Sequence, residues 1–99
     1  MKVIYHPEVD KIIRDLSIKE NSRVIKVVDF FENYKFSLER RFLKKITKGL
    51  WELRAGRYRL IFGLTGGNAV VTRIFLKKTQ KTPNKEIKLA TKRLKEYER

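Results

Sequence analysis

Apolar side chains in the N-terminal part of the chain recur with the period of an α-helix. Four aliphatic residues of "HPEVDKIIRDL" lie at positions i, i+3, i+4 and i+7, which is the spacing of one buried helical stripe. Pro7 stands where the first turn of a helix tolerates proline. The next segment, "SIKENSRVIKVVDFFENY", begins with Ser17 and Glu20 spaced as a capping box and repeats the apolar spacing. We predict two adjacent helices that form an α-hairpin.

Alternation of apolar and polar residues replaces the helical pattern farther along the chain. It predicts strands at about residues 50–55, 58–64 and 69–77, joined by hairpin turns in which "AGR" and "TGGN" supply the glycines. The preceding basic segment is irregular, and we expect only a short extended piece there, around Phe42. The apolar opening at residues 3–6 predicts one further short strand.

The last helix is predicted from its start signals. Thr82 is placed to be its N-cap and Pro83 its first residue. An apolar stripe follows, made of Ile87, Ala90, Leu94 and Tyr97. Together these patterns predict one α+β domain over residues 1–99. Its small antiparallel sheet consists of a three-strand meander and the short N-terminal strand, with the α-hairpin packed on one face and a C-terminal helix.

Positive charge is concentrated in one part of the sequence. The chain carries 25 lysine and arginine residues against 11 aspartate and glutamate residues, a net charge of +14 at pH 7. Residues 1–39 contain seven basic and seven acidic side chains, so residues 40–99 carry the whole excess. A field this one-sided attracts an anionic partner: nucleic acid, an acidic protein or an anionic membrane surface.

The rest of the composition excludes several classes of protein. Cysteine is absent, which rules out a disulfide framework and a thiolate metal site. No apolar run reaches the ~18 residues that a bilayer span requires, and no secretory signal is recognisable at the N-terminus. We therefore expect a cytoplasmic protein that does not act at a membrane.

Most catalytic chemistries also lack their residues. His6 is the only histidine, so two histidines cannot act as acid and base, and its place before Pro7 favours a structural role. The four carboxylates of the basic part are too scattered to indicate a Mg²⁺ site. The sequence contains neither a glycine-rich phosphate loop nor a serine–histidine arrangement. We expect no metal and no cofactor.

Strand alternation places the remaining cations on one face of the sheet. With the apolar positions under the helices, the uncovered face carries Arg54, Arg59, Arg73 and Lys77, with Lys78 and Lys81 at its rim. Arg57 lies in the first hairpin turn, and Lys85 lies on the last helix. Phe75 falls on the basic side and is the candidate for stacking on an unpaired base, whereas Trp51 and Phe62 are predicted to be core.

Such a surface binds phosphate groups. It can also stabilise the negative charge that develops when a ribose 2′-hydroxyl attacks the adjacent phosphorus, without a metal or a covalent intermediate. That reaction needs a proton acceptor, for which Lys77, Lys78 and Tyr58 are candidates. The residues by themselves are compatible with RNA cleavage and with a nucleic-acid-binding module that has no activity.

Two stretches, "GLWELRAGRYRLIF" and "RIFLKKTQKTPNKEIKLATKRLKEY", resemble the RelE/ParE superfamily of toxins, in its HigB-like, phage-protein-related branch. The opening "VIYHPEV" and the helical hairpin also fit, so the resemblance covers nearly the whole chain. It implies a small antiparallel sheet with an N-terminal helical hairpin against it. RelE-type members carry a tyrosine soon after the last strand, where this chain reads "TQKTPN".

The resemblance also implies a function and a site. RelE- and HigB-type members cut mRNA in the ribosomal A site, so we expect a ribosome-dependent endoribonuclease that is the toxin of a type II toxin–antitoxin pair. By resemblance, the expected catalytic residues are Arg59, Arg54, Lys77 and Lys78. From their charge and placement in the sequence, the expected RNA-binding residues are Arg57, Arg73, Phe75, Lys81 and Lys85. The expected partners are the ribosome, mRNA and a cognate helix-turn-helix, HigA-like antitoxin. The alternative within the superfamily is a ParE-like toxin that acts on DNA gyrase.

Overall fold

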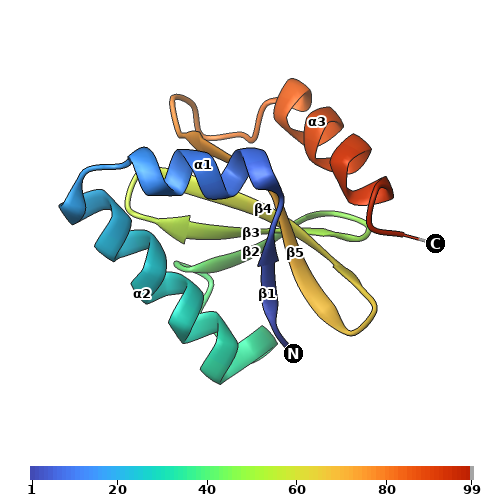
Figure 1. Cartoon of the computed structure of the whole chain (residues 1–99), viewed down its shortest axis with the longest axis horizontal. Coiled ribbons are helices and arrows are strands. Elements are labelled where there is room, and N and C mark those ends of the chain that lie inside the picture. Colours follow the sequence, from blue (N-terminus) through green and yellow to red (C-terminus); the bar gives the residue numbers. More distant parts are fainter. Residues whose placement is uncertain (99) are drawn as a thin grey trace.

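A computed structural model gives the structure of residues 1–98, in which helices lie on both faces of one sheet (Figure 1). In chain order the elements are β1 (Val3–Tyr5), α1 (Pro7–Asp15), α2 (Ile18–Tyr34), the 3-10 turn η1 (Lys35–Ser37), β2 (Leu43–Thr47), β3 (Leu50–Ala55), β4 (Tyr58–Thr65), β5 (Asn68–Leu76) and α3 (Asn84–Lys95). The predicted α+β class is confirmed. None of the described helices has the length and apolar character of a membrane span.

The five strands form a single sheet in the order β1-β5-β4-β3-β2. From β2 to β5 each strand is antiparallel to the next, as the alternation and the turns predict. β1 instead runs parallel to β5 and pairs Val3 with Ala69. The sheet is therefore mixed rather than wholly antiparallel, because the apolar pattern of a short strand does not encode its direction.

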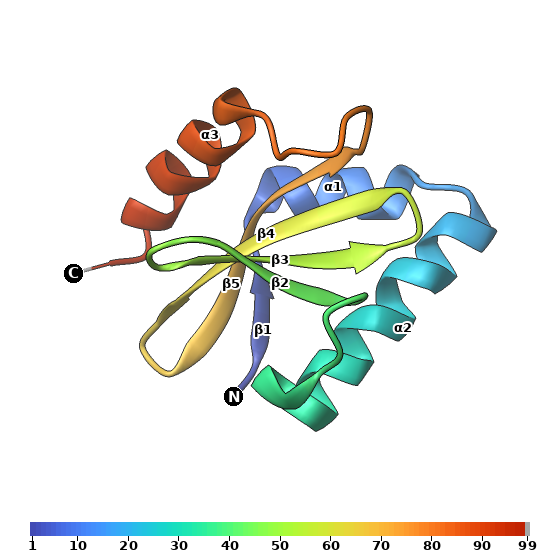
Figure 2. The same ribbon diagram turned by 180° about the vertical axis from the view of Figure 1, so that it is seen from behind.

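α1 and α2 cover one face of this sheet; α1 passes in front of the strands in Figure 1 and behind them in Figure 2. His6 caps α1, since its Nδ1 accepts from the Glu8 N–H at 3.1 Å. Ser17 caps α2, since its Oγ accepts from the Glu20 N–H at 3.2 Å. Both predicted structural roles are confirmed. The core on this face includes Val9, Val24, Phe31, Leu53, Leu60 and Phe62.

α3 lies on the opposite face and covers part of it. Leu94 packs there with Ile61 and Val70 in a second, smaller core. Gly63 of β4 permits the approach, because a methyl group on its Cα would overlap the Leu94 side chain and lie 3.1 Å from the Gly49 carbonyl oxygen. The expectation of a helix-free basic face is thus wrong in part, because the apolar stripe of the last helix must be buried as well.

The start of α3 also differs from the prediction. Pro83, not Thr82, occupies the N-cap position, and the helix begins at Asn84 without a side-chain cap. The Thr82 hydroxyl donates instead to Glu52 Oε1 at 3.1 Å. This hydrogen bond joins the segment before α3 to β3 and gives the buried Glu52 carboxylate one of its partners.

β2 is the strand that the sequence analysis missed. Only Leu43 of its five residues is buried, so the segment lacks the alternation that marks a half-buried strand. It pairs with β3 alone and forms an edge of the sheet, where Lys44 and Lys45 are typical residues. The expected short extended piece around Phe42 is therefore a full edge strand.

Candidate functional site

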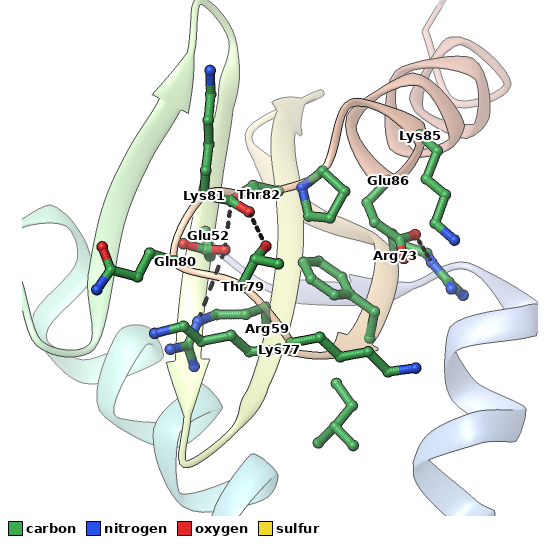
Figure 3. A pocket seen from close by; sticks show the side chains of 14 residues that line it. Glu52, Arg59, Arg73, Lys77, Thr79, Gln80, Lys81, Thr82, Lys85 and Glu86 are labelled. Carbon is green, nitrogen blue, oxygen red and sulfur yellow. Dashed lines mark hydrogen bonds and ion pairs between the residues drawn. The ribbon is translucent and has the colours of Figure 1, made fainter.

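A pocket of about 590 Å³ opens between the sheet and the start of α3. Its walls come from β3, β4, β5, the connection at residues 77–83 and the first turn of α3 (Figure 3). Six basic side chains line it, namely Arg59, Arg73, Lys77, Lys78, Lys81 and Lys85. Two carboxylates, Glu52 and Glu86, line it as well. Cations therefore dominate the pocket, although its own acids compensate some of them.

Strand pairing brings the basic residues of the sheet to one face. Arg54 of β3 pairs with Arg59 of β4, and Arg59 pairs in turn with Phe75 of β5. Directly paired residues project to the same side of a sheet. The pairing of Ile61 with Arg73 places Arg73 on that side too. The arrangement that alternation predicted is the one that the register produces.

Glu52 is the acidic centre of the pocket. Its side chain is only 4% exposed, and its Oε2 lies 3.5 Å from Arg54 Nε. Its Oε1 accepts the hydrogen bond from Thr82 and lies 4.0 Å from Arg59 Nε. A carboxylate buried this deeply requires such partners. Glu52 thereby holds two arginines and ties the 77–83 connection to the sheet.

Arg59 is fixed by the turn between β3 and β4. Its Nη1 donates to the Gly56 carbonyl oxygen at 2.8 Å and to the Tyr58 carbonyl oxygen at 3.0 Å. Burial lowers the pKa of Arg59 below its ordinary value; Glu52 opposes this shift and Arg54 adds to it. A guanidinium stays protonated at neutral pH even so. Arg59 is therefore an immobilised cation in the pocket wall.

Arg73 forms the shortest ion pair of the pocket. Its Nε lies 2.6 Å from Oε1 of Glu86, which belongs to the first turn of α3. A carboxylate is favoured at this end of a helix because it faces the positive end of the helix dipole. The pair fastens α3 to β5, so Arg73 both lines the pocket and maintains its shape.

The lysines supply the uncompensated charge. Within residues 1–98, none of Lys77, Lys78, Lys81 and Lys85 forms an ion pair. Figure 3 shows Glu52, Arg59, Thr79 and Thr82 in the middle of the pocket and Lys81 extending away from them. Positive charge that is available to an anionic ligand therefore comes mainly from the 77–83 connection and the start of α3.

Two of the predicted site residues lie outside this pocket. Arg54 lines a neighbouring pocket of about 210 Å³. Arg57 is exposed in the β3–β4 turn and lines neither pocket, while its carbonyl oxygen accepts from the Lys77 N–H at 2.7 Å. Phe75 does line the larger pocket but is half-buried against the second core, which leaves only part of its ring for stacking.

Tyr58 is removed from the candidates for a proton acceptor. It packs against the core under α1 and α2, on the far side of the sheet from the pocket. Burial raises the pKa of its hydroxyl, and the nearby Glu20 carboxylate adds to the rise. Of the three candidates, only Lys77 and Lys78 line the pocket.

The carboxylates are the part of the pocket that the sequence analysis missed. Glu52 and Glu86 are far apart along the chain, yet the docking of α3 brings both to the same pocket. Glu52 shares strand parity with Arg54, so a signal for its placement was present. The sequence contained no such signal for Glu86, because the position of Glu86 depends on the tertiary contacts of α3. Among the described residues, no group of three or more metal-binding side chains occurs.

Several solved structures share the fold. A chain of the archaeal RelE–RelB complex from Pyrococcus horikoshii matches with a TM-score of 0.62 and 20% identity, over 77% of this chain and 93% of that one. A chain of the RelBE2 toxin–antitoxin complex from Mycobacterium tuberculosis matches with a TM-score of 0.60 and 16% identity, over 77% of this chain and 96% of that one. A chain of the RelB–RelE complex from Methanococcus jannaschii matches with a TM-score of 0.57 and 17% identity, over 74% of this chain and 88% of that one. The fold is RelE-like, as the resemblance implied.

The fold and its basic pocket thus define the class, a RelE-like α+β protein. Within that class, residues 11–95 match the model of the family described as Phage derived protein Gp49-like (DUF891). The chain belongs to this family, which confirms the phage-protein-related branch. The comparison with curated proteins returned no match.

Proposed function

We propose that the protein is the toxin of a type II toxin–antitoxin pair and that it cuts mRNA on the ribosome at the basic pocket. The observation that carries the proposal is the convergence of six basic side chains on one pocket of a RelE-like fold. A phosphodiester is the ligand whose charge and size suit such a pocket. The three similar structures are complexes of RelE-type proteins with RelB-type partners, which supports the choice of a toxin.

The chemistry requires no metal. Attack of a ribose 2′-hydroxyl on the adjacent phosphorus adds negative charge to the phosphoryl oxygens and expels the 5′-oxygen, which leaves a 2′,3′-cyclic phosphate. Cations that are already fixed in place stabilise this charge without reorganisation. Arg59 is fixed by the turn carbonyls, and the pocket lysines supply the rest. Lys77 and Lys78 are the candidates for the acceptor of the hydroxyl proton.

The proposed partners follow from the same reasoning. The ribosome would position the message, and the lysines of α3 outside the pocket are placed to contact ribosomal RNA by charge alone. The cognate antitoxin is expected to be a helix-turn-helix, HigA-like protein that neutralises the basic surface. Its gene is expected beside the gene for this protein.

Lys77→Ala tests the proposal with little risk to the fold, because the side chain makes no ion pair within the described residues. The wild-type protein should cut mRNA at codon-spaced positions in a translating extract and leave the same RNA largely intact without ribosomes. Loss of the Lys77 amine, whether it stabilises the phosphate as a cation or accepts the proton, should slow cleavage roughly a hundredfold. Primer extension on the message measures both outcomes.

Lys11→Ala is the matched control, since Lys11 is exposed on α1 and lines neither pocket. It removes the same charge and should retain nearly full activity. Intact mRNA together with stalled DNA supercoiling by gyrase would contradict the proposal and favour the ParE-like alternative. Intact mRNA together with RNA binding would favour a module without activity.

A further inference from the structure

A second pocket adjoins the first on the same face of the sheet. It has a volume of about 210 Å³ and lies on the β2 side of the 77–83 connection. Glu52, Gln80, Lys81 and Thr82 line both pockets, and the Thr82–Glu52 hydrogen bond lies within this shared wall. The two pockets are therefore parts of one surface that the connection crosses.

The second pocket has cations of its own. Lys44 of β2 pairs directly with Glu52 of β3 and so projects to the face of the sheet that carries Glu52 and Arg54. Lys44 is exposed and forms no ion pair within residues 1–98. Arg54 keeps 27% of its side chain exposed beside the Glu52 carboxylate. Lys81 also lines this pocket, so these three cations share its wall with a single, almost wholly buried acid.

Lys45 does not belong to this group, although its residue contributes to the pocket wall. Its Nζ lies 5.8 Å from the centroid of the Trp51 ring, and Trp51 packs with the core on the α1 and α2 face. Of the two neighbouring lysines of β2, only Lys44 has the strand parity that directs its ammonium to the second pocket.

We propose that the second pocket binds a further phosphate of the same single-stranded RNA whose scissile phosphate occupies the first pocket. The inference rests on the proposed function. A flexible chain with one negative charge per nucleotide can pass over residues 80–82 and place one phosphate on each side. A compact monoanion would occupy one pocket only. Lys44 and Arg54 are assigned to the second phosphate, and Lys77 and Lys78 to the first.

The test compares two non-cleavable 2′-O-methyl RNAs, a dinucleotide with one phosphate and a hexanucleotide. Binding of each is followed by NMR titration at several salt concentrations, for the wild-type protein and for Lys44→Ala, Lys77→Ala and Lys11→Ala. Lys11 is exposed on α1 and lines neither pocket, so Lys11→Ala corrects for the change of net charge. The slope of log K against log salt changes by ~0.7 for each single-stranded phosphate contact that is lost.

The proposal expects Lys44→Ala to reduce the slope by ~0.7 for the hexanucleotide and to leave dinucleotide binding at the Lys11→Ala level. Lys77→Ala should weaken binding of both RNAs. Equal behaviour of Lys44→Ala and Lys11→Ala on the hexanucleotide, with Lys77→Ala still impaired, would overturn the second site and leave the proposed function standing. If Lys77→Ala also binds both RNAs normally, the assignment of the scissile phosphate to the first pocket fails and this inference fails with it, whereas codon-spaced cleavage in the translating extract tests the proposed function separately.

A hexaglutamate peptide distinguishes RNA from an acidic protein partner. The proposal expects the peptide to bind more weakly than the RNA of equal length and to depend on Lys44 no more than on Lys11. Peptide binding that is lost in Lys44→Ala, with RNA binding unchanged, would assign the pocket to a protein and overturn the proposal.

Discussion

Arg59 illustrates how one side chain serves both the pocket and the fold. Its guanidinium lines the pocket, yet it also bonds two turn carbonyls and faces the buried Glu52. Removal of the positive partner from a buried pair leaves a carboxylate without full compensation. A variant at this position therefore changes stability as well as any activity, and Lys77 is the better residue for a test of function.

Arg59→Ala should lower the free energy of unfolding by about 3 kcal/mol. Urea denaturation followed by circular dichroism measures the loss. Arg57→Ala in the same turn is the control, because its side chain is exposed and is expected to contribute almost nothing. Equal stability of the two variants would show that the contacts of Arg59 with Glu52 and the turn do not stabilise the protein.

Tyr5 gives the fold a pH dependence at alkaline pH. Burial, with smaller contributions from Glu32, Asp29 and Asp10, raises the pKa of its hydroxyl from 10.0 to about 12. The folded state therefore favours the protonated form. The contribution to stability is complete below pH 10 and is lost as the pH rises toward 12.

We expect the urea midpoint of the wild-type protein to fall between pH 9 and pH 11.5 by more than that of Tyr5→Phe, which cannot ionise at this position. The difference between the two proteins isolates Tyr5 from the other titrating groups. Parallel curves for the two proteins would show that the Tyr5 hydroxyl is not perturbed by folding.

At the scale of single residues, strand parity was the informative signal in the sequence. It placed Arg54, Arg59, Arg73 and Phe75 on one face, because side chains alternate strictly along a strand. It did not reveal that carboxylates hold the arginines, since the Arg73–Glu86 pair forms only once α3 has docked. Parity also separates Tyr58 from Arg59, and applying it to Tyr58 would have removed that proton-acceptor candidate.

Among the elements, α3 depends on one glycine for its place on the sheet. Gly63→Ala should destabilise the protein by about 1–3 kcal/mol, because the added methyl group overlaps the Leu94 side chain and lies against the Gly49 carbonyl. Thermal unfolding of the single variant measures the effect.

Leu94→Ala makes room for that methyl group and completes a double-mutant cycle. The penalty of Gly63→Ala should shrink in the Leu94→Ala background. An unchanged penalty would locate the strain at the Gly49 backbone instead of the helix. The pocket bordered by α3 should widen in the single variant, which a loss of RNA binding would report.

Element prediction succeeded where the apolar period was strong and failed at the edge of the sheet. The helices over residues 7–34 and the strands β3 to β5 follow from clear periods and glycine turns. β2 exposes most of its residues and is held by pairing with β3, a contact that periodicity does not encode. α3 starts one residue later than its start signals predicted, with Pro83 in extended backbone at the N-cap position.

For the whole molecule, the uneven charge of the sequence becomes a difference between two faces. The neutral N-terminal part forms the layer of α1 and α2, whereas the opposite face carries the pocket, the 77–83 connection and α3. Counts of charged residues predicted that the positive charge lies in the C-terminal part of the sequence, and strand parity predicted that it lies on one face of the sheet. The depth of the pocket could not be predicted, because it arises from the packing of α3.

A net charge of +14 should make stability increase with salt. The principal extents of the molecule are 36 × 29 × 25 Å, and the Debye length falls from about 30 Å at 0.01 M salt to about 3 Å at 1 M. Low salt therefore lets like charges repel across the whole fold. The melting temperature should rise by a few degrees over this range, as calorimetry in sodium chloride would measure.

Lys88→Glu lowers the net charge by two at an exposed position of α3 and should reduce the salt dependence. A melting temperature that falls with added salt would mean that the pocket's ion pairs outweigh the repulsion.

The parallel pairing of β1 with β5 has a consequence for biosynthesis. The strand that contains Val3 has no partner until Ala69 of β5 has been synthesised. During synthesis β1 therefore stays unpaired until β5 has been made and has left the ribosome. The pocket is complete only after Glu86 has been added as well. If the proposed function is correct, the nascent chain lacks a complete RNA-binding pocket, and so cannot attack the message of its own ribosome, until α3 has emerged.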